Sequence, residues 1–176
     1  MTVIAYKGGR MACDSLCSDV SSGLVAFQGN KIFRTRAGAL VGCSGAADSR
    51  AVLALLQNVK TGKQMPTSQQ FADTKCESEN GILIVLPDGE IWIAYITFDA
   101  EGQEWSADAC KVTGFNGMAY AGCGGGYAMT AMKAGKSAKE ACAIACEMSA
   151  FCRPPIYEHL LHPKKKAKKG GSRRQR

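Results

Sequence analysis

The chain has 176 residues, of which 46 % are hydrophobic and 21 % are charged, a balance typical of a globular protein with one substantial core. No run of 18 or more apolar residues occurs and the N-terminus lacks a signal-peptide pattern, so we expect a cytoplasmic protein with no membrane segment. The net charge of +7 is uneven, because residues 164–176 hold eight Lys and Arg and no acid, which leaves about −1 for the rest. We therefore expect one domain over residues 1–157 and a basic, disordered tail over residues 158–176.

Cysteine is frequent, with nine residues spread through strand-like and helix-like segments rather than in a compact disulfide framework. We interpret most of them as buried, reduced thiols. Cys142, Cys146 and Cys152 with His159 and His162 suggest a zinc site at first sight, but no C-x-x-C pair is present and the first two are one helical turn apart. We expect neither a metal nor a cofactor.

The first part of the chain has the character of short β-strands. Residues 2–7 and 10–14 are rich in β-branched and apolar side chains and flank a Gly-Gly pair, which predicts a hairpin. Further strands are predicted at residues 24–27, 31–34 and 39–41. From residue 46 the period changes, because Val52, Leu55, Leu56 and Val59 share one face of a helix that ends by Gly62.

The second part repeats the order of strands followed by helices. A short helix is expected at residues 68–73, a hairpin at 81–86 and 90–95, a strand at 118–122, a helix at 127–134 and a last helix that begins at a capping box of Ser137 and Glu140. The continuously apolar strand at 81–86 indicates cover on both faces. The order predicts an α+β fold, a four-layer αββα sandwich of two stacked antiparallel sheets between helical layers. Beyond Pro155 we expect no regular structure.

Five features occur in a particular order: Thr2 ahead of a strand, Asp14 in ACDS, Lys31 in GNKIFRT, Gly45 in LVGCSGAAD, and Cys123 in AGCGGGYAMTAMKAG. Each is weak alone. Their order and spacing over residues 2–152 resemble the proteasome β-type family of N-terminal threonine hydrolases (Ntn hydrolases), and especially its HslV-like branch. The resemblance implies the αββα sandwich that the strand and helix order predicts independently.

The resemblance implies a catalytic role for Thr2. Its hydroxyl would be the nucleophile and its own α-amino group, exposed once Met1 is removed, would be the base, because the pKa of such an amine, about 7.7–8.0, suits proton transfer at neutral pH. A positive charge on Lys31 would lower the pKa of both groups. Asp14 would orient and neutralise that lysine.

The resemblance also assigns roles to Gly45 and Cys123. The Gly45 N–H would face the oxyanion of the tetrahedral intermediate, and Cys123 stands where the family usually has a serine near the N-terminal amine, which makes it a weaker hydrogen-bond partner. The acid and serine that the family places after its last helix have no clear match in EMSAFCRPPI. Glu147 comes too early, and Phe151 stands near the place of the acid.

The expected function is therefore that of a threonine endopeptidase acting on polypeptides, and the resemblance implies a homo-oligomeric ring or stacked rings fed by an AAA+ unfoldase. One alternative is a catalytically inactive structural or nucleic-acid-associated protein that uses the basic tail, Lys164–Arg176, which could equally bind an acidic partner. Another is an Ntn amidohydrolase for a small-molecule amide. The glycine cluster at 124–126 could be a phosphate loop, but it lacks G-x-x-x-x-G-K-[ST].

Overall fold

A computed structural model of the chain describes residues 2–16, 29–45, 49–77 and 81–162. The strand expected at residues 24–27 and most of the expected tail lie outside these residues. Within the described segments, no helix has the length and apolar character needed to cross a bilayer.

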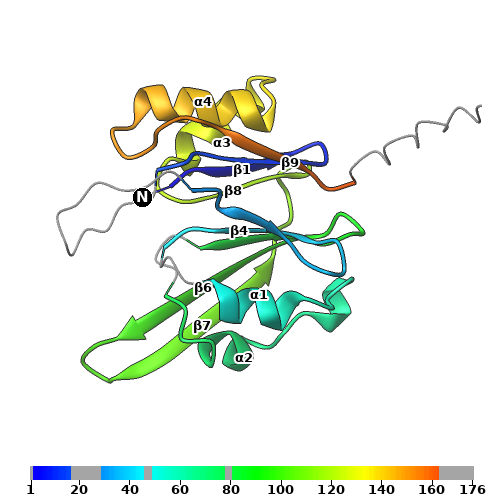
Figure 1. Ribbon diagram of the computed structural model, residues 1–176, viewed down its shortest axis with the longest axis vertical. Coiled ribbons are helices and arrows are strands. Elements are labelled where there is room, and N and C mark those ends of the chain that lie inside the picture. The colour runs from blue at the N-terminus through cyan, green and yellow to red at the C-terminus, as the bar shows by residue number, and fades with distance from the viewer. Residues whose placement is uncertain (1, 17–28, 46–48, 78–80, 163–176) are drawn as a thin grey trace, which may run out of the picture.

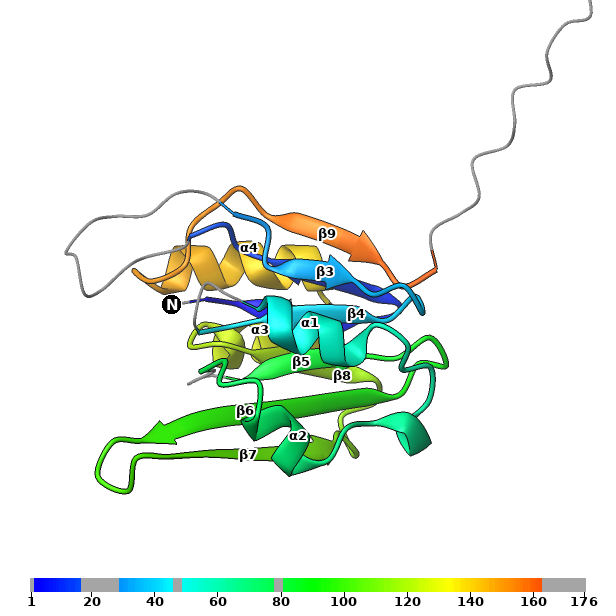
Figure 2. The same cartoon turned by 60° about the horizontal axis from the view of Figure 1, so that its bottom comes forward.

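The described chain forms four layers, helices, sheet, sheet and helices (Figure 1). The first sheet has the order β8 (Met118–Ala121), β1 (Ile4–Lys7), β2 (Arg10–Cys13) and β9 (Tyr157–Leu160). The second sheet has the order β3 (Ile32–Arg34), β4 (Leu40–Cys43), β5 (Ile82–Val85), β6 (Ile91–Asp99) and β7 (Glu104–Lys111), and Figure 2 shows its strands next to one another. All of these pairings are antiparallel. The predicted α+β sandwich is confirmed.

Two helices cover the outer face of each sheet. The first sheet packs against α3 (Gly125–Lys133) and α4 (Ala138–Met148), and the second against α1 (Arg50–Leu56) and α2 (Ser68–Ala72). All four residues of β5 are buried, with Leu83 in the core between the sheets and Ile84 in the core under α1. The prediction that this strand is covered on both faces is therefore confirmed.

The β1–β2 hairpin fixes where the N-terminus lies. Its turn residues Gly8 and Gly9 have φ of 57° and 76°, the left-handed conformation that a two-residue hairpin needs at both positions. Along the strand, Ile4 faces the core between the sheets and Ala5 faces α3 and α4. Thr2, two residues ahead of β1, is thereby held at one end of the sandwich, between the two sheets.

The last helix begins as predicted. Ser137 and Glu140 form the capping box, with each backbone N–H donating to the other side chain, and the hydrogen bonds from Ser137 lower the pKa of the Glu140 carboxyl. Ala141 and Ala145 are buried against the first sheet, whereas Met148, the last residue of the helix, is 61 % exposed.

Three other expectations are corrected. The helix predicted from residue 46 to Gly62 is only Arg50–Leu56, and a short 3-10 helix, η1 (Gly62–Gln64), follows it. Strand β7 was not predicted, because its sequence, EWSADACK, has no β-branched residue. The strand forms because eight of its positions pair with β6. Strand β9 continues regular structure past Pro155 and past the domain boundary expected at residue 157, since all four of its residues pair with β2.

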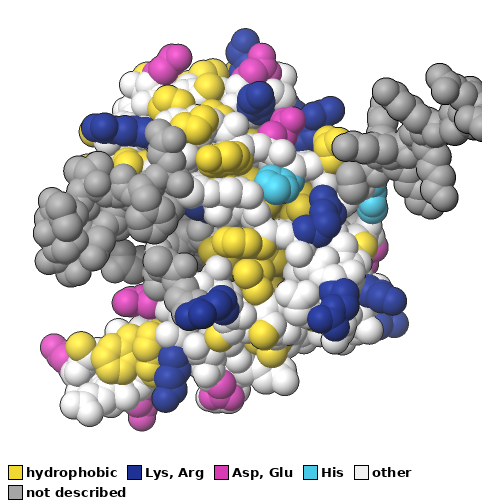
Figure 3. Space-filling view, viewed as in Figure 1, with side chains coloured by type: hydrophobic (Ala, Val, Ile, Leu, Met, Phe, Trp, Pro, Cys, Tyr) yellow, Lys and Arg dark blue, Asp and Glu magenta, His cyan; other side chains and the backbone are white. Residues whose placement is uncertain are grey.

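The surface agrees with a nearly neutral body. Figure 3 shows Lys and Arg side chains interspersed with Asp and Glu on the face in view. Hydrophobic side chains gather at the end of the β6–β7 hairpin, where Phe98, 41 % exposed, contacts Trp105 with ring centroids 5.1 Å apart.

Candidate active site

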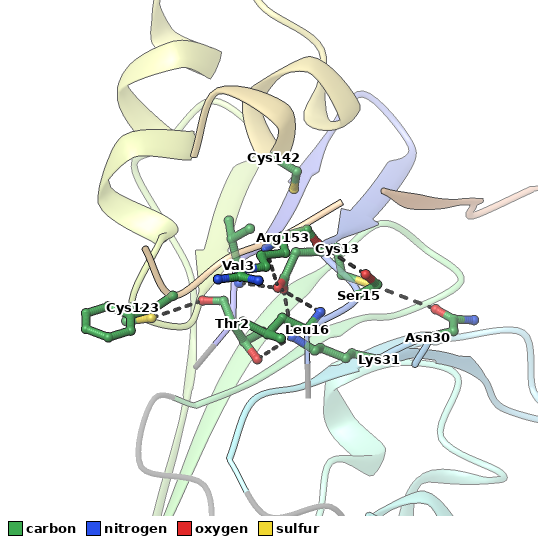
Figure 4. A network of polar contacts seen from close by, with 12 residues as sticks. Thr2, Val3, Cys13, Ser15, Leu16, Asn30, Lys31, Cys123, Cys142 and Arg153 are labelled. Carbon is green, nitrogen blue, oxygen red and sulfur yellow. Dashed lines mark hydrogen bonds and ion pairs between the residues drawn. The ribbon is translucent and has the colours of Figure 1, made fainter. Parts of the chain in front are cut away.

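A hydroxyl, an ammonium and a carboxylate meet where the two sheets face each other at the N-terminal end of β1. Lys31 Nζ lies 2.7 Å from Thr2 Oγ1 and 2.7 Å from Asp14 Oδ1. Figure 4 shows Lys31 reaching toward Thr2, to which a dashed contact joins it. Thr2 is 4 %, Lys31 7 % and Asp14 0 % exposed. The structure thus brings together three of the five expected site residues in a water-poor environment, where charges act strongly on a neighbouring hydroxyl.

The Asp14 carboxylate is held by four donors. Oδ1 accepts from the Val3 N–H at 3.0 Å and from Lys31, and Oδ2 accepts from the N–H groups of Leu16 at 3.1 Å and Arg153 at 3.3 Å. A fully buried charge is tolerated when it is paired and its lone pairs are satisfied. The arrangement fixes the carboxylate and, through it, the position of the lysine ammonium.

The glycine segment before α3 holds the main chain of Thr2. The Thr2 carbonyl accepts from the Gly124 N–H at 3.1 Å and from Cys123 Sγ at 3.6 Å. Gly122 has a φ of 87°, and a Cβ there would lie 2.2 Å from the Thr2 carbonyl oxygen. Only glycine fits this close approach. The segment therefore positions the candidate nucleophile, and this geometry gives the phosphate-loop alternative no support.

Cys123 and the segment after α4 differ from the family pattern. The exposed Cys123 thiol contacts the Thr2 carbonyl and not its hydroxyl. Phe151 is 49 % exposed, and its N–H bonds to Ser149 Oγ. Glu147 is also exposed, and neither it nor Phe151 has a hydrogen bond to Thr2 within the described chain. No described acid therefore replaces the one that the resemblance led us to look for there.

The segment after α4 contributes main-chain atoms that sequence reasoning missed. The Arg153 N–H binds Asp14, while the Arg153 carbonyl accepts from the Ser15 N–H at 3.0 Å and from Ser15 Oγ at 3.2 Å. Ser15, directly after Asp14, was the only one of these groups with a recognisable side chain in the sequence. The residue type at position 153 could not reveal the contact, because every residue except proline has the backbone N–H and carbonyl that make it.

Gly45 lies beyond β4 and close to the lysine. The Cys43 N–H donates to the Lys31 carbonyl at 3.0 Å, which brings this end of β4 beside the base of the Lys31 side chain. Gly45 is exposed and has a φ of 118°. Ser44, between them, is 3 % exposed, and its Oγ is buried without a hydrogen-bond partner. Ser44 was not among the residues singled out from the sequence.

Four of the thiols around the site are poor nucleophiles. Burial raises the pKa of Cys43 and of Cys152 to about 12 and that of Cys146 to about 11. Cys142, whose Sγ lies 3.4 Å from the Ala12 carbonyl, has its pKa raised further by burial. Since the thiolate is the reactive form of cysteine, these four side chains do not compete with Thr2 at neutral pH.

Comparison with known proteins gives matches by structure and none by sequence. No model of a protein family matches the chain, and no curated protein does. The fold matches eukaryotic HslV from Trypanosoma brucei with a TM-score of 0.60 at 16 % identity, over 90 % of this chain and 97 % of that one. It also matches BPH from Thiobacillus denitrificans, free and in complex with epoxomicin, with a TM-score of 0.53 for each, at 18 % and 19 % identity, over 92 % of this chain and 98 % and 99 % of those. The chain therefore has a proteasome β-type, HslV-like fold.

Proposed function

We propose that the protein is a threonine-type peptidase that uses Thr2 as its nucleophile after removal of Met1. The observation that carries this proposal is the 2.7 Å contact between Lys31 Nζ and Thr2 Oγ1, made by a lysine that is also paired with buried Asp14. A buried ammonium beside a hydroxyl favours the ionised form of that hydroxyl, which is the form that attacks a carbonyl.

The reaction would form and cleave an acyl-enzyme. Thr2 Oγ1 adds to the carbonyl carbon of the scissile peptide while its proton passes to the free α-amino group, and the carbonyl electron pair moves to oxygen. Collapse of this intermediate breaks the C–N bond, and the proton goes to the leaving amine. A water molecule then adds to the ester in the same way, which releases the carboxylic acid and restores the Thr2 hydroxyl.

The remaining residues would prepare this chemistry. Asp14 holds the Lys31 ammonium in place, and the Gly45 N–H faces the oxyanion. The contacts of Gly124 and Cys123 with the Thr2 carbonyl keep the first residue of the mature chain from moving. Such preorganisation, rather than motion during the reaction, is the main source of rate enhancement in sites of this kind.

Assembly and partners belong to the same proposal. The likeness of fold to HslV supports a homo-oligomeric ring or stacked rings, with an AAA+ unfoldase that delivers polypeptides, in the cytoplasm. A role of the basic tail in binding nucleic acid or an acidic partner is a separate proposal, which a shift assay at two salt concentrations tests.

One observation favours a second candidate, a catalytically inactive structural protein. Phe151, which is exposed and apolar, stands near the place where the family pattern has the acid that supports the N-terminal amine. An amine without this partner is a less well-positioned base, so the assay must distinguish a slow enzyme from an inactive protein.

Hydrolysis of fluorogenic peptides by the purified protein tests the proposal, after intact-mass measurement of the N-terminus. We expect a mass without Met1, turnover that Thr2→Ala abolishes, and a large loss in Lys31→Ala. Lys60→Ala, at an exposed lysine, is the control and should retain wild-type turnover. Retention of Met1, or equal turnover in wild type and Thr2→Ala, would refute the proposal in favour of the inactive candidate.

A further inference from the structure

Ser44 directly follows the last residue of β4, and the alternation of side chains along that strand indicates which way it faces. Side chains alternate along the strand: a Cβ on Gly42 would lie 2.8 Å from Ile4 Cγ2 in the first sheet, whereas Cys43 packs with the core under α1. Ser44 therefore returns to the face of Gly42. Because the Cys43 N–H donates to the Lys31 carbonyl, this end of β4 is the end at which Lys31 reaches Thr2.

Three hydrogen-bond donors at this point are unused. The Ser44 hydroxyl has no partner, and within the described residues no group accepts from the backbone N–H of Ser44 or of Gly45. A buried hydroxyl without a partner is unfavourable and calls for an explanation in a native structure. Packing alone does not supply one, since alanine would occupy nearly the same volume without an unpaired polar group.

We propose that Ser44 is a further catalytic residue, whose hydroxyl donates a hydrogen bond to the oxyanion that forms when Thr2 attacks a carbonyl. This inference rests on the proposed function. The hydroxyl would act beside the Gly45 N–H, and it would find its partner only when negative charge develops on the substrate oxygen. Interactions made only in the transition state raise the rate of the chemical step.

Ser44 and the candidate nucleophile are both buried, with Thr2 4 % and Ser44 3 % exposed. A hydroxyl that donates to the oxyanion must lie within hydrogen-bond distance of the substrate oxygen. The proposal therefore requires that a carbonyl bound at Thr2 Oγ1 also reaches Ser44 Oγ.

The rate of covalent modification by epoxomicin tests the inference on the full-length protein. Attack of Thr2 Oγ1 on the ketone of this peptide forms a C–O bond, moves the carbonyl electron pair to oxygen and passes the hydroxyl proton to the free α-amino group. The reaction therefore creates the oxyanion without a natural substrate. We expect Ser44→Ala to slow adduct formation, followed by intact mass, by roughly 100-fold, the usual effect of removing one oxyanion donor. Ser44→Gly, a second variant without the hydroxyl, should show the same loss.

The melting temperature separates this role from a structural one. Loss of an unpartnered hydroxyl should leave the melting temperature of Ser44→Ala unchanged or raise it. Ser49→Ala, at another buried serine that begins α1 on the opposite side of β4, is the control and should react like the wild type.

Three outcomes would overturn the inference. Ser44→Ala that reacts at the wild-type rate leaves the proposed function intact and removes Ser44 from it. Slow reaction together with a lowered melting temperature shows that the hydroxyl has a structural partner. Wild-type protein without Met1 that does not react at all contradicts the proposed function and, with it, this inference.

Discussion

Two buried polar side chains, Asp14 and Ser44, differ in how far their hydrogen-bonding capacity is used. The Asp14 carboxylate receives four hydrogen bonds from three separate segments of the chain, whereas the Ser44 hydroxyl receives and donates none. A saturated group has no capacity left for a ligand and serves to hold its neighbours. An unsaturated group has its capacity free. We infer that the Asp14 side orients the nucleophile and that the Ser44 side receives the substrate.

Removal of the Asp14 carboxylate should have the largest effect on the stability of the protein. Asp14→Ala removes the carboxylate that is paired with the buried Lys31 ammonium, and we expect the free energy of unfolding to fall by about 3–5 kcal/mol. Urea unfolding measures this change. Arg10→Ala, which breaks an exposed ion pair with Glu158, is the control and should lose less than about 1 kcal/mol. Equal losses in the two variants would contradict the special status of the Asp14 side.

A second variant displaces the nucleophile itself. Gly122→Ala places a Cβ 2.2 Å from the Thr2 carbonyl oxygen at a φ of 87°, so we expect a loss of stability and of epoxomicin labelling. Gly89→Ala has a similar φ of 89° with no atom within 4 Å of the new Cβ, and should show only the backbone strain, about 1–3 kcal/mol. The difference between the two variants measures the contact with Thr2. Equal rates of epoxomicin labelling in Gly122→Ala and Gly89→Ala would contradict the claim that the close approach of Gly122 positions Thr2.

A milder substitution tests the contact between Cys123 and the Thr2 carbonyl. Cys123→Ser replaces a thiol donor, 3.6 Å from the Thr2 carbonyl, by a stronger hydroxyl donor. One better hydrogen bond, about 1 kcal/mol, would raise the labelling rate by up to about fivefold. Cys110→Ser, at an exposed cysteine of β7, should leave the rate unchanged. A slower reaction in Cys123→Ser would show that the thiol itself is needed.

The last prediction concerns the pH dependence of stability that arises from Cys43, the thiol next to Ser44. Burial raises the pKa of Cys43 from 9.0 to about 12, so above pH 9 the folded chain keeps a proton that the unfolded chain has lost. Stability from this group is therefore fully present below pH 9 and is lost as the pH rises toward 12. Urea unfolding at several pH values between 9 and 11 should show a shallower decline for Cys43→Ala than for the wild type. Parallel declines would contradict the burial of this thiol.

The sequence predicted the parts of the fold that have strong local signals. The Gly8-Gly9 turn, the apolar run of β5 and the capping box of Ser137 each specify their structure within a few residues. Strand β7 and strand β9 could not be predicted in this way. Their side chains are exposed or half-buried, and their order comes from pairing, of β9 with the distant strand β2 and of β7 with β6.

The residues of the candidate site also differ in whether the sequence could identify them. Thr2, Asp14 and Lys31 could be singled out because side-chain chemistry and order along the chain identify them. The Arg153 backbone contact could not, because any residue type supplies an N–H and a carbonyl. Ser44 is next to Gly45 in the sequence, but the lack of a hydrogen-bond partner for its hydroxyl can be seen only in the folded chain.

The most direct test of the account is the location of the epoxomicin adduct on the wild-type protein. Digestion and tandem mass spectrometry of the treated protein identify the modified residue. We predict one adduct on Thr2, in a peptide that begins at Thr2 because Met1 is gone. An adduct on a cysteine such as Cys123, or none on a chain that begins at Thr2, would contradict the claim that the Lys31–Asp14 pair makes Thr2 the nucleophile.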